Sequence, residues 1–387
     1  MTTNNETKRA SPSSYVTTRI SGVGSRYDRV GGESAIFARS VSGGTVGREF
    51  VSFPSLVPPG GHHPTDLSDI KSALVAEIAS ASYDDQMMDR LHETAYQTSA
   101  VGNSLGSPLL GTADSVSSVT AGDVKSVAGN TWGEDVVVVG TGSGEHGKLV
   151  EDVAKAYGSL PKSGGAAVVK AGEKSSFIGS DVRIRYDSHG TATVALAFAG
   201  ASHADPKAMP LALMRAVLGS YATSDGLGKN VASSMCQEVA DHGLATSISA
   251  FNLSYSDAGL FGVIMTAPDN KLDDLLWYVM PNLVRLAHGI SDEELVRAKL
   301  ALKASICASY DGDIVSGETI ASQINTIGRV MSLAEALARV DALTMADVKA
   351  TAGEVINDQD HALAAIGGIH ELPDYNWIRR KSYMLRY

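Results

Sequence analysis

The sequence is poor in cysteine, in basic residues and in long apolar runs, and each shortage excludes a class of protein. Only Cys236 and Cys307 occur among the 387 residues, which excludes a disulfide framework and a Cys-x-x-Cys site. No apolar run reaches the roughly eighteen residues of a membrane-spanning helix. The net charge of −11 argues against a nucleic-acid partner, which needs a basic surface. We expect a globular chain with two ordinary buried thiols in a reducing compartment.

The sequence contains an internal repeat. Residues 120–146 and 344–370 share the pattern T-x-x-D-V-K-x-x-A-G without a gap, and each ends in histidine. The threonine and the aspartate of each copy have the spacing of a helix capping box, and an apolar run follows at the same offset. A short helix, a loop and a buried strand are therefore expected twice. A weaker similarity between residues 18–28 and 194–206 supports a duplication, with a shortened first copy.

Two copies of one unit predict two homologous domains. Helical periodicity at residues 66–98 and 291–309, with strand-like runs at 191–198 and 248–255, indicates α+β domains, each a sheet covered by helices. The predicted division is an N-terminal tail at 1–14, a first domain at 15–160, a linker at 161–174, a second domain at 175–370 and a C-terminal tail at 371–387.

A glycine-rich stretch suggests a dinucleotide site at first sight. Four valines run into Gly140, Gly142 and Gly144, and an amphipathic segment follows, as in a strand, phosphate-binding turn and helix. The acidic residue that such a site needs about 20 residues later is missing. The second copy of the repeat does not keep the glycine pattern, with Ala364 and Ile366 at two of these positions. We interpret the stretch as a structural turn.

Motifs for metal or nucleophilic chemistry are missing as well. The ten histidines are scattered, and none forms H-x-x-E-H, H-E-x-x-H or H-x-H. No G-x-S-x-G turn occurs, and Cys236 and His242 lie on different faces of one expected helix. The residues alone give no basis for a metal or cofactor site.

Three stretches resemble one known family. Residues 91–112 (LHETAYQTSAVGNSLGSPLLGT) and 249–263 (SAFNLSYSDAGLFGV) resemble mitochondrial processing peptidase β subunits and complex III core proteins, which are pitrilysin-like metallopeptidases. Residues 371–387 (ELPDYNWIRRKSYMLRY) resemble the β/core 1 branch in particular. The resemblance covers roughly residues 15–387. It implies two pitrilysin-like α+β domains, each a mostly antiparallel sheet covered by helices.

The resemblance also implies that catalysis is lost. Active members of the family hold zinc with H-x-x-E-H, in which the histidines are ligands and the glutamate is the general base. At the matching positions this sequence has Ile36 for the first histidine, Arg39 for the glutamate and Ser40 for the second histidine. Isoleucine has no lone pair to donate, and arginine repels a dication. An inactive peptidase homologue without zinc or another cofactor is implied.

The implied function is therefore structural. The chain would be a non-catalytic core 1-type subunit of mitochondrial ubiquinol–cytochrome c oxidoreductase (complex III), peripheral on the matrix side of the inner membrane. Its partners would be a core 2-like homologue, cytochrome b, cytochrome c1 and other complex III subunits. The alternative is a non-catalytic subunit of a mitochondrial processing peptidase with a zinc-bearing partner. A nicotinamide-dependent enzyme ranks third.

The C-terminal end is basic and aromatic on an acidic chain. Its candidate docking residues are Trp377, Arg379, Arg380, Lys381 and Arg386. Such a segment is suited to anionic lipid headgroups or to a membrane partner. A solvated tail is the alternative, because charge runs commonly face water.

Overall fold

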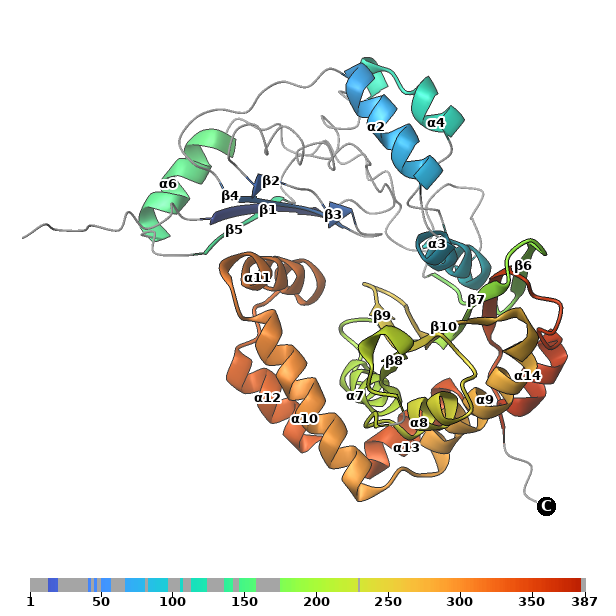
Figure 1. The fold of residues 1–387 in the computed structure, drawn as a ribbon. Coiled ribbons are helices and arrows are strands. Elements are labelled where there is room, and N and C mark those ends of the chain that lie inside the picture. The colour runs from blue at the N-terminus through green and yellow to red at the C-terminus, as the bar shows by residue number, and fades with distance from the viewer. Residues whose placement is uncertain are drawn as a thin grey trace, which may run out of the picture. The chain divides into compact units, whose positions relative to one another are not determined.

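The computed structural model describes residues 13–19, 41–42, 45–46, 50–56, 67–80, 83–96, 105–106, 113–123, 136–141, 146–157, 175–228 and 230–383. The chain divides into two compact units, which Figure 1 shows with their elements labelled. Unit 1 comprises Met1–Ser80, Leu109–Lys170 and Ser309–Val330. Unit 2 comprises Ala81–Pro108, Ala171–Ala308 and Met331–Tyr387. Neither unit is one continuous segment of the chain.

Unit 1 contains an antiparallel sheet. Its strands are β1 (Ser13–Arg19), β2 (Val41–Ser42), β3 (Thr45–Val46), β4 (Phe50–Leu56) and β5 (Val136–Thr141). The order is β2-β4-β1-β5, and β3 also pairs with β4. The helices of unit 1 are α2 (Leu67–Ser80), α4 (Ala113–Ser118), α6 (His146–Tyr157) and α11 (Asp313–Ile327).

Helix α11 supplies the side chains that cover β5. Ile320 and Ile324 lie one turn apart on α11 and form, with Ala321, an apolar cluster with Val137 and Val139 of β5. The β-branched valines suit an extended strand whose side chains alternate between its two faces. Two segments far apart in the sequence thus make one core.

Unit 2 contains a larger sheet. Its strands are β6 (Asp181–Arg185), β7 (Thr191–Ala199), β8 (Ser220–Ala222), β9 (Ser247–Ser254), β10 (Gly259–Pro268) and β11 (Ala362–Gly367). The order is β6-β11-β7-β10-β9-β8, in which β6 and β11 are parallel and the other pairs are antiparallel.

Helices cover both faces of this sheet. The helices of unit 2 are α3 (Tyr83–Tyr96), α7 (Ala208–Leu218), α8 (Ser234–Asp241), α9 (Leu272–His288), α10 (Asp292–Ser309), α12 (Leu333–Ala342), α13 (Met345–Val355) and α14 (Tyr375–Lys381), with short 3₁₀ turns η2 (Thr223–Asp225) and η3 (Asp269–Lys271). Helix α3 packs on one face, and α7, α8, α9 and α13 share the core on the other face.

Side-chain alternation along β7 assigns residues to these two cores. Leu196 and Phe198 point into the core with α7 and α9, whereas Ala195 and Ala197 face α3. The small alanines allow α3 to approach the sheet closely. On the neighbouring strand, a Cβ at Gly262 would lie 2.0 Å from the carbonyl oxygen of Leu196, so only glycine fits there.

The two sheets share one arrangement around their central strands. In unit 1, β1 pairs antiparallel with β4 and β5, and in unit 2, β7 pairs in the same way with β10 and β11. Both capping boxes of the repeat are formed. The hydroxyl of Thr120 accepts from the backbone N–H of Asp123 at 3.3 Å, and Thr344 and Asp347 repeat that contact at 3.3 Å. The predicted α+β fold with two homologous, mostly antiparallel sheets covered by helices is confirmed.

The domain bounds predicted from the repeat stay a prediction. They describe two continuous segments, residues 15–160 and 175–370, whereas the compact units exchange segments. Ala81–Pro108 belongs to unit 2, and Ser309–Val330 belongs to unit 1.

Most local predictions are met. The strands expected at 191–198 and 248–255 are β7 and β9, and the helix expected at 291–309 is α10. The helix expected over 66–98 is two helices, α2 and α3, which end and begin at Ser80 and Tyr83. Cys236 is buried, but Cys307 is exposed, so its expected burial is wrong. Within the described ranges, no helix is long and apolar enough to cross a membrane.

Candidate functional site

The positions that the family resemblance aligns with the zinc motif lie outside the described residues. This applies to Ile36, Arg39 and Ser40, and likewise to Arg386 at the C-terminal end. Where the structure does describe the chain, no group of three or more histidine, cysteine, aspartate or glutamate side chains is placed to hold a metal ion. The other candidate docking residues lie in unit 2.

The segment expected as a C-terminal tail includes helix α14, which is built into unit 2. Ile378 is fully buried in the core that also contains α9, and Trp377 packs against that core. The helix carries Trp377, Arg379, Arg380 and Lys381 together. Arg380 is exposed, whereas Trp377, Arg379 and Lys381 are partly buried. Four of the five candidate docking residues, all except Arg386, therefore lie on one short helix.

Arg379 fastens α14 to the turn before β11. Its guanidinium pairs with the carboxylates of Asp358 at 2.8 Å and Asp360 at 2.7 Å. It also donates to the Ser382 hydroxyl at 2.9 Å and to the backbone oxygen of Asp358 at 2.9 Å. These contacts lie within the chain, so they hold the helix in place.

A second anchor of α14 is an aromatic stack. The imidazole of His361 is fully buried and lies face to face with the ring of Tyr375, with ring centroids 4.1 Å apart. The Tyr375 hydroxyl donates to the His361 backbone oxygen at 3.0 Å. Neither ring nitrogen of His361 has a hydrogen-bond partner among the described residues. Burial lowers the pKa of His361 to about 4, so the ring is neutral at pH 7.

Lys381 lies over two indole rings. Its Nζ is 3.8 Å from the ring centroid of Trp277, on α9, and 5.3 Å from that of Trp377. The two indoles are 6.2 Å apart and tilted by 41°. An ammonium group above an indole face is attracted by the negative face of the ring. Trp277 is 55% exposed, which is unusual for so large an apolar side chain.

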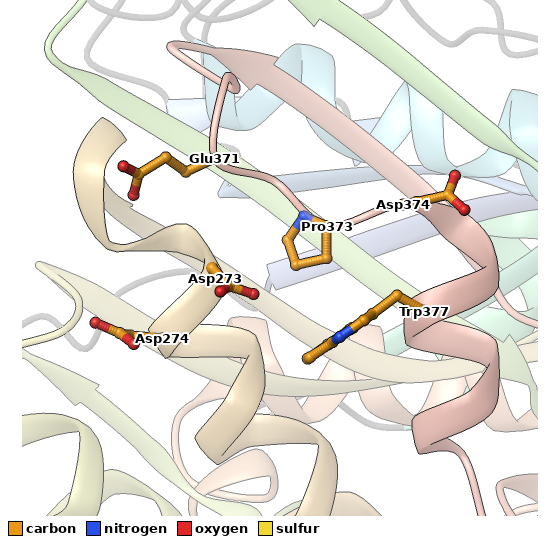
Figure 2. A pocket seen from close by; sticks show the side chains of 6 residues that line it. All are labelled: Asp273, Asp274, Glu371, Pro373, Asp374 and Trp377. Carbon is orange, nitrogen blue, oxygen red and sulfur yellow. The ribbon is translucent and has the colours of Figure 1, made fainter.

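Beside these rings lies an acidic pocket of about 540 Å³ (Figure 2). It is lined by Asp273, Asp274, Glu371, Pro373, Asp374 and Trp377. The indole of Trp377 extends from α14 toward the first turn of α9, which carries the two neighbouring aspartates. Glu371 lies on the side away from α14, and the Asp374 carboxylate points away from the indole.

The four carboxylates of this pocket are not bound by other side chains of the described residues. None of them forms an ion pair or a side-chain hydrogen bond with another residue in the described part of the chain. Asp273 and Asp274 stand in the first turn of α9 and Asp374 at the N-cap of α14, where the helix dipole favours negative charge, so these side chains stay ionised and can still pair with a cation. The pocket therefore combines carboxylates that have no ion-pair partner with the partly buried indole of Trp377, and the exposed Trp277 lies next to that indole.

The sequence points to Trp377 and Lys381 but does not single out Trp277 or the pair Asp273 and Asp274. Trp277 stands in an apolar run, LLWYVM, where a tryptophan is ordinarily read as core. A usable signal was present: Asp273 and Asp274 precede it by four and three residues, which places it on the polar face of an amphipathic helix.

Comparison with known proteins identifies relatives. Residues 133–302 match the family model described as the peptidase M16 inactive domain. The cytochrome b-c1 complex subunit 1, mitochondrial, of Saccharomyces cerevisiae is 31% identical over 318 residues, which cover 81% of this chain and 68% of the yeast protein. The chain belongs to the peptidase M16 family.

Other relatives of this M16 chain carry a different name. The probable mitochondrial-processing peptidase subunit beta of Arabidopsis thaliana is 38% identical over 306 residues, or 79% of this chain. The chain spans only 57% of the length of that relative, and 66% of the β subunit from Blastocladiella emersonii.

A solved structure has the same fold. A chain of complex III2 from Candida albicans, bound to Inz-5, superposes with a TM-score of 0.83 at 24% identity. The match covers 97% of this chain and 96% of that chain, and at this identity it supports the fold alone.

Proposed function

We propose that this M16 chain is a non-catalytic structural subunit of core 1 type in mitochondrial complex III. The observation that carries the proposal is the match to the yeast cytochrome b-c1 complex subunit 1 over four fifths of the chain. The match to a domain described as inactive supports a structural role, as does the replacement of the zinc motif by Ile36, Arg39 and Ser40. Without a ligand or a general base at these positions, metal-assisted hydrolysis lacks its chemical basis.

In this proposal the chain lies peripherally on the matrix side of the mitochondrial inner membrane. It pairs with a core 2-like homologue and supports cytochrome b and cytochrome c1, without binding haem itself. We include Arg380 and Arg386 as contacts to the membrane side, to anionic headgroups or to a membrane subunit. Arg380 suits this role because its side chain is exposed, whereas Arg379 is held by Asp358 and Asp360.

Purification of the native complex tests the proposal. An affinity-tagged full chain, isolated in mild detergent from its own mitochondria, should bring down the haem absorbance of cytochromes b and c1. An untagged preparation is the control, and Arg380→Glu should lower the haem recovered per mole of chain. Recovery of the tagged chain without either haem spectrum would contradict membership of complex III.

The second candidate is the non-catalytic half of a processing peptidase. The 38% identity to the Arabidopsis processing peptidase β subunit favours it. The chain would then need a separate partner that carries H-x-x-E-H. Mixing the purified chain with such a partner and a presequence substrate decides the matter. Cleavage that requires both chains supports this candidate, whereas cleavage by the partner alone counts against it.

A further inference from the structure

The exposed face of Trp277 is not explained by the fold of unit 2. Its neighbours on α9, Leu276, Val279 and Met280, are fully buried in the core, whereas Trp277 is 55% exposed. An indole held in water forgoes the favourable free energy of burying its large apolar surface. Exposed aromatic side chains with a polar surround are typical of protein interaction surfaces.

The surroundings of Trp277 define the charge of its partner. We call Trp277, Trp377, Asp273, Asp274 and Glu371 the indole–carboxylate surface. Its three carboxylates have no ion-pair partner among the described residues. The only cation on its indoles that the described part of the chain supplies is Lys381, and its position shows that these rings accept an ammonium group.

The geometry suits a long basic side chain. The pocket volume of about 540 Å³ accommodates several side chains, far more than a metal ion needs. Lysine and arginine carry an apolar stem and a charged head, which match an indole face and a neighbouring carboxylate. An anionic membrane surface would be repelled by the same carboxylates.

We propose that the indole–carboxylate surface docks a basic segment of a protein partner. One lysine or arginine of that segment lays its stem on the part of Trp277 that Lys381 leaves exposed, and pairs with Asp273 or Asp274. This inference does not rest on membership of complex III, because it follows from the charges and aromatic faces of unit 2 alone.

Peptide binding to the purified full chain tests the inference. The probe is a short fluorescent amphipathic peptide of leucine, lysine and arginine, and its twin carries glutamate at every basic position. The test variant Asp273→Asn/Asp274→Asn removes two charges from the first turn of α9. Its matched control, Asp292→Asn/Glu293→Gln, removes two exposed charges from the first turn of α10. Trp277→Ala is matched by Leu300→Ala, at a site that is 62% exposed.

The basic peptide should bind the wild type and both controls equally. Each test variant should weaken binding by about fivefold to tenfold, the effect of losing one or two exposed contacts. Circular dichroism monitors the folding of each variant. If the aspartate variant unfolds, the inference is tested by two other results: weaker peptide binding by Trp277→Ala, and loss of peptide binding by the wild type at high salt.

Three results would overturn the inference. Equal losses in the test and control variants would indicate general attraction to an acidic protein. Equal binding of the glutamate twin would leave no role for the carboxylates. Binding of anionic phospholipid vesicles that depends on Trp277, without peptide binding, would assign the surface to a membrane.

Discussion

The burial of the single side chain of His361 makes the stability of unit 2 depend on pH. It stacks on Tyr375 and lies 6.4 Å from the ring of Phe198, in a site without water-facing surface. The charged groups around it are Asp360 and Asp181, which favour its protonation, and Arg379 and Arg183, which oppose it. Burial outweighs them and keeps the imidazole neutral, so α14 rests on an uncharged ring.

Acid should therefore destabilise unit 2 through His361. The pKa of the folded state, about 4, lies below the ordinary value of 6.5, so between these values only the unfolded chain takes up the proton. The free energy of unfolding should fall by roughly 3 kcal/mol as the pH drops through this window, and no further below it. His361→Phe should flatten this dependence in urea unfolding at pH 7, 5.5 and 4.5. His242→Phe, at an exposed site, should leave it in place, and an equal slope in both variants would contradict the role of His361.

Residue chemistry was only partly predictable. The sequence identified Trp377 and Lys381 among five candidate docking residues, because they stand in one short basic and aromatic stretch. Trp277 is about one hundred residues earlier, and nothing in the local pattern says that α9 lies beside α14. The pairing of Arg379 with Asp358 and Asp360 escaped notice for the same reason, because a turn and a helix meet only in the folded chain.

Among the elements, both copies of the repeat begin with a helix capping box. In each, the threonine hydroxyl accepts from the aspartate N–H, and the aspartate carboxylate accepts from the threonine N–H. Hydrogen bonds from Thr344 lower the pKa of Asp347, as those from Thr120 lower the pKa of Asp123. Both carboxylates are therefore ionised in the capping boxes at the starts of their helices.

Loss of the cap hydroxyl should destabilise helix α13. Thr344→Ala removes the acceptor for the first turn of a helix that carries the buried Val348 and Ala352, at a cost of about 1 kcal/mol. Thr344→Ser keeps the hydroxyl and should retain most of the stability. Chemical unfolding of the two variants measures the difference, and an alanine variant as stable as the serine variant would contradict the cap.

The periodicity of apolar residues predicted where the helices lie better than it predicted which strands they pack against. Met87, Leu91 and Ala95 lie four residues apart and form the buried stripe of α3, as the pattern over 66–98 indicated. The same pattern carries no information on which sheet receives the stripe. It packs on β7 and β11 of unit 2, although α2 just before it belongs to unit 1.

At the scale of the whole molecule, the proposed loss of zinc binding can be tested directly. The purified full chain, incubated with equimolar zinc and desalted, should retain far less than one zinc per chain by elemental analysis. The matched variant Ile36→His/Arg39→Glu/Ser40→His restores the side-chain types of the motif and should retain more. One zinc per chain in the unaltered protein would contradict the loss of the site.

The duplication was visible in the sequence because the repeat is free of gaps. The first copy is shorter in its middle than the second copy. A comparison of the two copies therefore does not show which helices between the matching segments correspond. Capping boxes and strands depend on residues close in sequence, so they are predictable locally. The exchange of segments between the two units depends on long-range packing, for which a single sequence offers no signal.

That exchange has a consequence for how the protein is made. The cluster of Val137 and Val139 receives its covering residues Ile320, Ala321 and Ile324 from α11, more than 150 residues later in the chain. During synthesis this face of β5 stays uncovered until most of the protein has left the ribosome. Unit 1 therefore cannot be completed as an independent first domain, and a polypeptide that stops before α11 exposes an apolar strand to aggregation.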